Sequence, residues 1–384
     1  MKDKKLVIIS RSFAPLVIGS PILLANLFSS YPGRLEAIAG WQYGAKIDPE
    51  FKPPCPTTYL RMPGSLPQRA FDRYTQELIP FIRLFIIRQL KKMKPDAVLG
   101  TCPSGEFFIA GYQACKKLGI PFMAHMHDLW EENVPVTSHK KEMAIKWERE
   151  ILMNAERVYC MTDVQKQFYH DKYGINPRLL PHTIRAEELN NKSVFDGAKI
   201  KRKTKKIVYT GNVSNGMNLD AVQQFVKAVD HLPKEYEIKM FVSWDKELCQ
   251  KFNIYHERII YDWLPMSEVQ KEMQEANLLF LPLSHKNASM DEVHTVFATK
   301  TLDYLVSGSP ILAFSPPDSF HSISAKKNGW AYVTDKDDPL AIVEGILKVT
   351  NDEILSSQLV EKAFDEAMSR NPEKYATELY SQLP

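Results

Sequence analysis

The chain has 384 residues, of which 44% are hydrophobic and 25% are charged, and its net charge is +3. This composition is that of a globular protein and excludes fibrous and intrinsically disordered classes. The small net charge argues against a nucleic-acid footprint over the whole chain, so we expect no nucleic-acid partner. A chain of this length favours two domains.

The first half of the chain alternates short apolar runs with helical patterns. Strands are predicted at 6–9, 97–100, 120–127 and 157–161, and helices at 21–29, 68–93, 107–117 and 140–154. Such alternation favours a parallel sheet covered by helices.

The second half repeats this pattern. Strands are predicted at 207–210, 237–242, 278–281 and 311–314, and helices at 219–229, 267–275 and 301–306. We therefore expect an α/β protein of two doubly wound, Rossmann-like domains facing across a cleft. The expected boundaries are 1–185 and 186–365, with a C-terminal helix at 366–384 that can pack back on the first domain. Ligands of such sheets bind at the carboxyl ends of the strands.

Five cysteines stand at unpaired spacings, with no neighbouring cluster of histidines. We therefore predict neither a disulfide framework nor a zinc site, and the free thiols indicate a reducing, cytoplasmic compartment. The apolar run before Arg11 lasts only about five residues, which is too short for a signal peptide. No stretch approaches the roughly 18 apolar residues of a membrane span.

Three residues of the second half have the chemistry of a phosphate and hydroxyl site. Lys300 stands at the start of a predicted helix, where the helix dipole disfavours a cation unless an anion lies nearby. Asp303 follows one turn later, and a carboxylate accepts hydrogen bonds from two neighbouring hydroxyls. Gly211 ends a strand, so its bare backbone would let a phosphate approach closely. The plainer interpretations are a solvated lysine, a charge at a helix start and a simple turn.

Five segments together resemble a known family: HDLW (127–130), LLPHTI (179–184), IVYTGNVSNGMNLDAVQQFVKAV (207–229), ANLLFLPL (276–283) and FATKTLDYLVSGSPIL (297–312). They are similar to GT-B-fold glycosyltransferases, most of all glycosyltransferase family 4. The stretch HDLWEEN resembles the members that build bacterial surface polysaccharides.

The resemblance implies an activity. A first, acceptor-side domain and a second, nucleotide-sugar-binding domain would transfer a hexosyl or N-acetylhexosaminyl group, with anomeric retention, to a hydroxyl of a glycan or lipid-linked acceptor. The donor would be UDP- or GDP-linked, and neither a cofactor nor a metal would be needed.

The resemblance also implies roles for individual residues. Catalytic roles fall on His127 and Lys300. Donor binding falls on Gly211, Asn212, Thr295, Val296, Phe297, Thr299, Lys300 and Asp303, and an acceptor-side loop is formed by Gly19, Ser20 and Asp128. We expect His125 to face away from His127 and to serve packing.

The chain departs from the family pattern at three places. Thr295 stands where the family has a glutamate, no cation follows Gly211, and Ser20 replaces a second glycine. These departures keep two alternatives open, namely an epimerase or hydrolase of the same fold and a non-catalytic nucleotide-sugar binder. The only carboxylate pair that stands out for acid–base work is Glu131 and Glu132.

Two basic segments raise the question of membrane contact. Residues 77–94 are apolar almost all round with basic residues near the end, which is typical of a buried helix. The alternative is a helix whose basic end touches anionic lipid at the inner face of the membrane. Six basic residues at 199–206 favour a solvated linker, or would add to such a contact.

Overall fold

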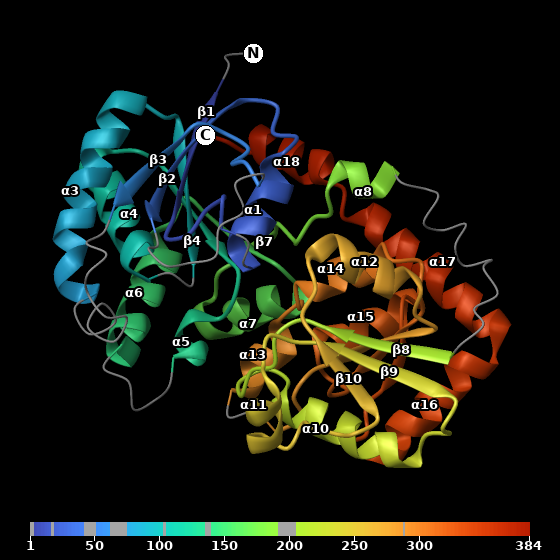
Figure 1. The fold of residues 1–384 in the computed structure, drawn as a ribbon. Helices are drawn as coiled ribbons and strands as arrows, with labels where there is room; N and C mark the ends of the chain where they lie inside the picture. The colour runs from blue at the N-terminus through green and yellow to red at the C-terminus, as the bar shows by residue number, and fades with distance from the viewer. Residues whose placement is uncertain are drawn as a thin grey trace. The chain divides into compact units, whose positions relative to one another are not determined.

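A computed structural model describes residues 4–16, 19–41, 51–61, 75–102, 105–134, 140–190, 205–286 and 289–384. The chain divides into two compact units (Figure 1). The first unit comprises residues 1–185 together with 371–384, and the second comprises residues 186–370.

Within the described residues, the first unit contains a seven-stranded parallel sheet in the order β3-β2-β1-β4-β5-β6-β7. Its strands are β1 (Lys5–Ser10), β2 (Arg34–Trp41), β3 (Thr57–Arg61), β4 (Ala97–Cys102), β5 (Phe122–Met126), β6 (Arg157–Cys160) and β7 (Arg178–Leu179). Its helices are α1 (Gly19–Phe28), α3 (Thr75–Met93), α4 (Gly105–Leu118), α5 (Trp130–Asn133), α6 (Lys140–Asn154), α7 (Asp163–Tyr173) and α18 (Pro372–Ser381).

The core of the first unit has two sides because strand side chains alternate between the faces of the sheet. Val7 and Ile9 of β1 belong to the cluster formed with α3 and α4. Leu6 and Ile8 belong to the cluster formed with α1 and α18. Both faces are therefore covered, as parallel sheets require.

The C-terminal helix α18 packs on the first unit, beside α1 (Figure 1). The ring of Tyr380 meets that of Tyr31 edge to face at 5.8 Å. The Tyr159 hydroxyl donates to Gln382 Oε1 at 2.9 Å. The helix before it, α17 (Glu353–Ser369), belongs to the second unit, so residues 366–370 lie there and not with α18.

The described part of the second unit contains a six-stranded parallel sheet in the order β10-β9-β8-β11-β12-β13. Its strands are β8 (Lys205–Thr210), β9 (Tyr236–Phe241), β10 (Ile259–Asp262), β11 (Leu278–Pro282), β12 (Ile311–Phe314) and β13 (Tyr332–Thr334). Its helices are α8 (Ala186–Asn190), α10 (Leu219–Ala228), α11 (Lys246–Lys251), α12 (Met266–Gln274), α13 (Met290–Thr295), α14 (Lys300–Leu305), α15 (Phe320–Asn328), α16 (Pro339–Asn351) and α17, with the 3-10 turn η2 (Val229–His231) after α10.

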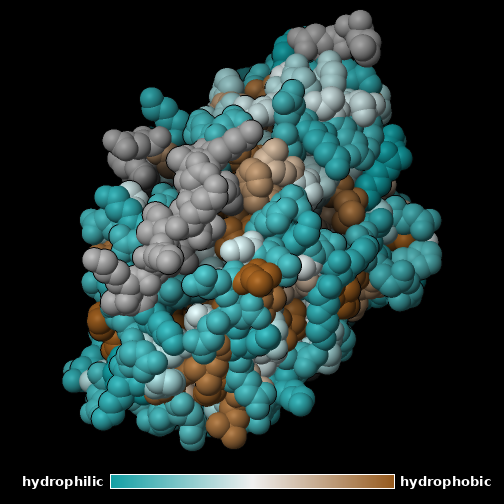
Figure 2. Space-filling view, turned by 90° about the vertical axis from the view of Figure 1, so that its right-hand side faces the viewer, coloured by the Kyte–Doolittle hydropathy of each residue, from teal (hydrophilic) through white to brown (hydrophobic). Residues whose placement is uncertain are grey.

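On the face shown in Figure 2, apolar side chains occur in small groups among hydrophilic ones. Scattered exposed apolar residues of this kind are normal for a folded domain. None of the helices in the described ranges is long and apolar enough to cross a membrane.

Candidate active site

The second sheet reverses its strand order between β8 and β11. From β8 the chain proceeds outward to β9 and β10, and then returns to β11, β12 and β13 on the other side. In open α/β sheets, ligands bind outside the carboxyl ends of the strands at such a switch point. The loop that starts at Gly211, directly after β8, lies at this position.

Gly211 brings the backbone close to Lys300. Its φ of +99° is a conformation that side-chain-bearing residues rarely adopt. A Cβ atom at this position would lie 3.4 Å from Lys300 Nζ. The Gly211 N–H donates to Phe241 O at 3.0 Å, so this donor is already satisfied by the neighbouring strand.

Lys300 is held over Tyr209 of β8. Lys300 Nζ donates to the Tyr209 hydroxyl at 2.9 Å and lies 4.2 Å from the ring centroid. The hydroxyl in turn donates to Asn212 O at 2.9 Å and accepts from Asn218 Nδ2 at 3.2 Å. The lysine, the strand end and the loop after Gly211 thus form one hydrogen-bonded group.

The ammonium of Lys300 is partly buried and has no carboxylate partner among the described residues. Burial lowers the pKa of Lys300 to about 7, because desolvation disfavours the charged form and no acidic group opposes it. An anion placed here would favour the protonated lysine.

α14 is too short to supply much of a helix dipole. It has six residues, and its N-cap, Thr299, makes no side-chain capping hydrogen bond. The family resemblance implies that Thr299 and Lys300 both bind the donor. In this geometry the charge of Lys300 is the main electrostatic contribution, since the dipole effect falls off within a turn.

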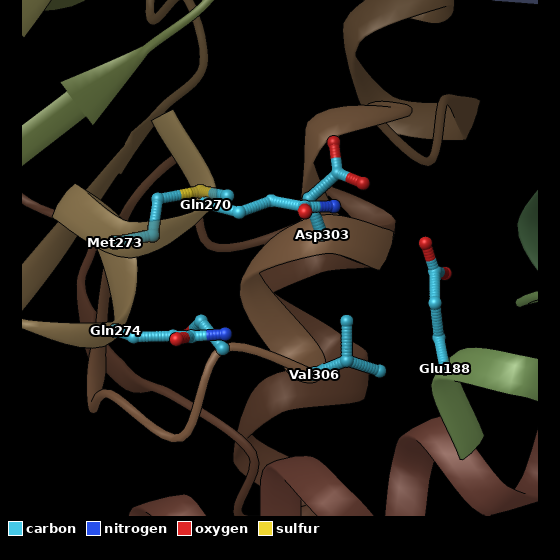
Figure 3. A pocket seen from close by; sticks show the side chains of 7 residues that line it. Glu188, Gln270, Met273, Gln274, Asp303 and Val306 are labelled. Carbon is cyan, nitrogen blue, oxygen red and sulfur yellow. The ribbon is translucent and has the colours of Figure 1, made fainter. Parts of the chain in front are cut away.

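Asp303 lies one turn after Lys300 and lines a small pocket (Figure 3). The other lining residues are Glu188, Gln270, Met273, Gln274, Val306 and Ser307. Carboxylates and carboxamides both form hydrogen bonds with hydroxyl groups. The pocket is therefore compatible with the hydroxyl-binding role predicted for Asp303.

Thr295 and Phe297 direct their side chains into the unit. Thr295 ends α13 and its Oγ1 donates to Asp291 O at 2.9 Å. The Phe297 ring stacks on His321 at 5.1 Å, and the Arg370 guanidinium lies 3.8 Å from its centroid. Because the side chains of Thr295 and Phe297 are buried, a ligand that binds at 295–297, as predicted, would contact backbone atoms there.

His321 supports the segment that carries Lys300, and the sequence analysis does not identify it. Its Nε2 accepts from Ala298 N at 3.3 Å and lies 3.0 Å from Thr301 Oγ1. Burial lowers the pKa of His321 to about 3, helped by the nearby Arg370, so the ring is neutral and its Nε2 is free to accept. A lone histidine in a helical stretch gives no sequence signal for this role.

A larger pocket lies at the carboxyl ends of β9 and β10, with a volume of about 520 Å³. One of its lining residues contacts the loop after Gly211, since Ser243 Oγ donates to Asn212 Oδ1 at 3.1 Å. It is lined by Val242, Ser243, Trp244, Asp245, Lys246, Tyr255, Ile259, Tyr261, Asp262 and Trp263. The side chain of Trp263 is 55% exposed, so it offers a flat apolar surface to a ligand.

In the first unit, the structure brings His127 and Ser20 together. His127 directly follows β5, and its Nδ1 lies 2.9 Å from Ser20 Oγ in the first turn of α1. The expectation for His125 is wrong: His125 Nδ1 lies 3.2 Å from His127 Nε2. Residues i and i+2 of an extended strand share a face, so the two imidazoles meet.

The other acceptor-side residues are less constrained. Gly19 is exposed, and a Cβ atom built on it would meet no atom within 4 Å, so sterics do not require a glycine there. Asp128 is partly buried in the loop that follows His127.

That loop is anchored by a carboxylate cluster around Lys172 of α7. Lys172 Nζ lies 2.6 Å from Glu131, 2.6 Å from Glu132 and 2.9 Å from Glu148. In the described ranges, these three glutamates are the one group of at least three histidine, cysteine, aspartate or glutamate side chains close enough together to hold a metal ion. Its centre is taken by the ammonium. Although burial opposes it, the three carboxylates raise the pKa of Lys172.

Two parallel, helix-covered sheets, followed by a C-terminal helix that belongs to the first unit, define the GT-B class of fold. Residues 49–188 match the family model described as Glycosyltransferase Family 4. This match confirms the resemblance to glycosyltransferase family 4 over that part of the chain. The narrower likeness to members that build bacterial surface polysaccharides stays a prediction.

Solved structures share this fold over nearly the whole chain. Sucrose-phosphate synthase from Thermosynechococcus elongatus is 14% identical, with 99% of both chains covered and a TM-score of 0.74. HepE from Anabaena, in complex with UDP and glucose, is 12% identical, covering 99% of this chain and 100% of its own, with a TM-score of 0.66. A putative UDP-N-acetylglucosamine 2-epimerase from Listeria monocytogenes is 13% identical, covering 99% of this chain and 95% of its own, with a TM-score of 0.58. None of the curated proteins compared with the chain matches it in sequence.

Proposed function

We propose that the protein is a retaining glycosyltransferase that acts without a metal ion. It moves a hexosyl or N-acetylhexosaminyl group from a UDP- or GDP-linked donor to a hydroxyl of a glycan or lipid-linked acceptor in polysaccharide biosynthesis. The observation that carries this proposal is Lys300, a partly buried lysine with a lowered pKa at the switch point of the second sheet.

Lys300 would stabilise the nucleoside diphosphate as a leaving group. A cation aimed at the developing charge in a partly desolvated site lowers the barrier without a metal. The lysine is pre-positioned by Tyr209, so little reorganisation is needed when the diphosphate forms. The departing phosphate would then take the acceptor's proton, and we assign no separate general base.

The rest of the donor would occupy the pocket lined by Asp303, one turn after Lys300, and the pocket at the ends of β9 and β10. The base would bind at the ends of β9 and β10, where Trp263 offers a stacking surface. The ribose would meet Asp303. UDP is favoured over GDP because HepE, which shares the fold, was solved with UDP and with UDP-glucose.

Ligand-induced thermal shifts test the donor site. UDP at 100 times its dissociation constant stabilises a protein by about 2.7 kcal/mol, and GDP serves as the comparison. We expect a shift with the parent protein and none with Lys300→Ala. Lys227→Ala, which changes an exposed lysine of α10, is the matched control and is expected to bind like the parent. Equal binding by Lys300→Ala would remove the central argument.

The epimerase alternative is favoured by one likeness, that to the Listeria protein. The two carboxylates that the sequence offers for acid–base work, Glu131 and Glu132, are both bound to Lys172. A panel of nucleotide-sugar donors with mass analysis of products separates the candidates. Transfer supports the proposal, an isomerised donor supports an epimerase, free sugar supports a hydrolase, and binding without turnover supports a non-catalytic binder.

Contact with the inner face of the membrane is proposed through α3. Its buried face, with Ile82 and Ile86, packs in the core, while Phe81 and Leu84 are 72% and 47% exposed. Arg83, Arg88, Lys91 and Lys92 are also exposed, which gives an amphipathic basic surface.

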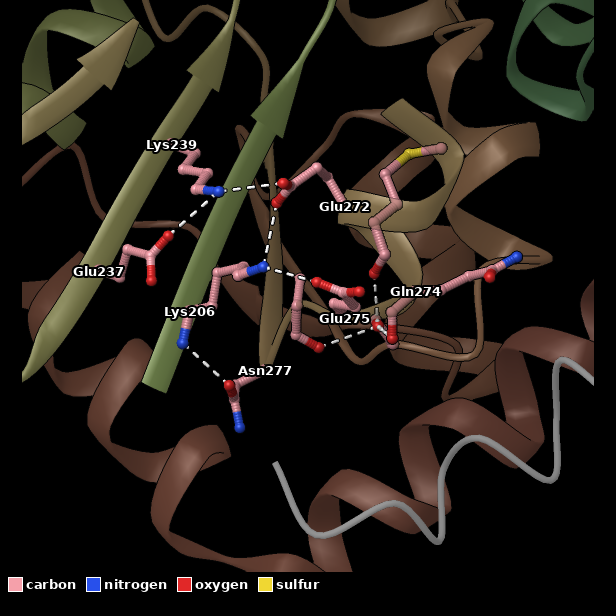
Figure 4. A network of polar contacts seen from close by, with 10 residues as sticks. Lys206, Glu237, Lys239, Glu272, Gln274, Glu275 and Asn277 are labelled. Carbon is pink, nitrogen blue, oxygen red and sulfur yellow. Dashed lines mark hydrogen bonds and ion pairs between the residues drawn. The ribbon is translucent and has the colours of Figure 1, made fainter. Parts of the chain in front are cut away.

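The basic run at 199–206 adds no support to this contact. Residues 199–204 lie outside the described ranges, and Lys206 forms ion pairs with Glu272 at 3.0 Å and Glu275 at 2.9 Å (Figure 4). Sedimentation with vesicles tests α3: we expect binding to anionic but not neutral lipid at low salt, weakened by Phe81→Ser. Failure to bind anionic vesicles at low salt would exclude the contact.

A further inference from the structure

A chain of three hydrogen bonds runs from a backbone carbonyl of the first unit to Ser20. His125 Nε2 lies 3.0 Å from Leu180 O, His125 Nδ1 lies 3.2 Å from His127 Nε2, and His127 Nδ1 lies 2.9 Å from Ser20 Oγ. The carbonyl is fixed by the sheet, since Leu180 N donates to Cys160 O at 2.9 Å. The two histidines are 1% and 4% exposed, whereas Ser20 is only partly buried.

The carbonyl sets the direction of every bond in this chain. A carbonyl oxygen only accepts, so His125 carries its hydrogen on Nε2. The neutral His125 therefore accepts at Nδ1, and His127 must donate from Nε2. His127 then accepts at Nδ1, and the Ser20 hydroxyl must donate to it. Both imidazoles are fixed in one tautomer by a backbone atom.

The deep burial of both rings keeps them neutral. Desolvation lowers the pKa of His125 to about 4. It lowers the pKa of His127 well below its usual value, with further contributions from His125 and His182. Protonation of either ring would create a buried cation. The hydrogen bonds therefore orient the two imidazoles and the Ser20 hydroxyl, and the rings do not store a proton.

We propose that Ser20, and not His127, is the residue of this group that contacts the substrate, and that its oxygen accepts a hydrogen bond from a sugar hydroxyl. Both nitrogens of His127 are already engaged within the protein, so the imidazole has no free atom for a ligand. The hydrogen of Ser20 is committed to His127, which leaves the oxygen only its lone pairs. Ser20 thus selects a hydroxyl donor, and His127 and His125 are positioning residues.

The tautomers are independent of the proposed function, whereas the contact with a sugar hydroxyl rests on it. Long-range ¹H–¹⁵N NMR of protein labelled at histidine tests the tautomers directly. We expect His125 and His127 to show a protonated Nε2 and an unprotonated Nδ1 at pH 7. In Ser20→Ala, the His127 Nδ1 resonance moves further downfield, because it loses a hydrogen bond. A protonated Nδ1 on His127 in the parent would overturn the inference.

Addition of ligand tests the contact without requiring turnover. UDP-glucose is expected to shift the His127 Nδ1 resonance in the parent, whereas UDP alone is not, if the hydroxyl belongs to the donor sugar. If only an acceptor glycan shifts it, the hydroxyl belongs to the acceptor. If neither shifts it, the contact is refuted, whether or not the protein transfers sugar.

Kinetics complete the test where transfer is observed. Ser20→Ala is expected to lower kcat/KM by roughly five- to tenfold, the effect of one lost neutral hydrogen bond, and Ser20→Thr is expected to restore it. The UDP dissociation constant should stay unchanged in both variants. Parental kcat/KM in Ser20→Ala would refute the contact, whereas absence of transfer in the parent would refute the proposed function instead.

Discussion

Lys300 combines two properties that usually exclude one another, a partly desolvated ammonium and the absence of a carboxylate partner among the described residues. Such a site favours an anionic ligand, because the ligand supplies the negative charge that would otherwise come from a carboxylate. Perturbed groups of this kind cluster at functional sites. Two predictions follow from its pKa of about 7.

The first concerns the pH dependence of donor binding. UDP-glucose is the ligand of choice because neither phosphate of its diphosphate diester titrates near neutral pH. A bound diphosphate raises the pKa of Lys300, so binding requires the protonated lysine. The dissociation constant should be flat below pH 7 and rise above it, by up to about tenfold per pH unit. Calorimetry in buffers of different ionisation enthalpy should show uptake of about one proton at pH 8.5.

Lys300→Arg provides the control for this behaviour, because arginine stays charged throughout the range. If this variant binds, its dissociation constant should not change between pH 6 and 9. A parent protein whose affinity is equally flat would contradict the lowered pKa of Lys300.

The second prediction concerns stability without ligand. The folded pKa of Lys300 is lowered relative to about 10.4 in the unfolded chain. Between these values the unfolded state binds more protons, so this lysine makes the parent more stable as pH rises from 7. Lys300→Met removes a buried charge at pH 6 but only a neutral amine at pH 9. Its melting temperature relative to the parent should therefore be highest at pH 6 and decline towards pH 9. A pH-independent difference would contradict the prediction.

The residues around Lys300 show which contacts the sequence could not predict. Lys300 stands out in the sequence, but its partner Tyr209 lies 91 positions away in a strand and looks like a core residue. His321 and Arg370 are likewise brought to Phe297 only by the fold. The wrong expectation that His125 faces away from His127 has a different origin. Residues i and i+2 of a strand lie on the same face, so the sequence itself places the two histidines side by side.

At the scale of elements, most strands inside the two sheets could be predicted, whereas β2 and the edge strands β3, β7, β10 and β13 could not. β4, β5, β11 and β12 are fully buried and consist mostly of apolar residues. β10 and β13, at the two edges of the second sheet, are four and three residues long and partly exposed. These strands contain too few apolar residues to give a recognisable strand pattern.

The sequence of α3 is apolar almost all round, yet only one face of the helix is buried. Its exposed side carries both apolar and basic residues.

The cluster around Lys172 ties α5, α6 and α7 together, and it supports a prediction at this scale. Glu148 of α6 is fully buried, and removing the ammonium would leave three carboxylates without this cation. Lys172→Met should lower the free energy of unfolding by about 3–5 kcal/mol at pH 8, the cost of breaking a buried ion pair. Burial already raises the pKa of Glu132. Without Lys172 this pKa rises further, so the loss should shrink at pH 5, where the variant's carboxyl groups take up protons.

Urea unfolding at both pH values measures this effect. Lys116→Met is the control, because its ammonium pairs with Glu150 at 3.2 Å on the surface, and its removal should leave the unfolding free energy nearly unchanged. A Lys172→Met variant as stable as the control at pH 8 would show that the cluster does not anchor the loop after His127.

At the scale of the whole molecule, the path of the chain couples its two ends. β1 begins at Lys5, and the last helix, α18, contributes Leu379 to the same core cluster as Leu6 and Ile8. Arg157 Nε donates to Gln382 O at 3.0 Å, so residues after α18 also bind β6. Residues 371–384 therefore complete the first unit, although they follow the second in sequence.

Removal of residues 371–384 should destabilise the first unit alone. The truncation exposes the cluster around Leu6 and Ile8 and removes the buried Leu379 and Leu383, whereas Lys300, Tyr209 and Gly211 keep all their described partners within the second unit. Calorimetry should show a transition at lower temperature that does not respond to UDP, beside a second transition that does. Leu379→Ala should reproduce the shift in part, with a cost of about 2–5 kcal/mol for one buried leucine, and Glu373→Ala, which changes an exposed side chain of the same helix, should not. Loss of UDP binding on truncation would instead show that donor binding depends on the first unit.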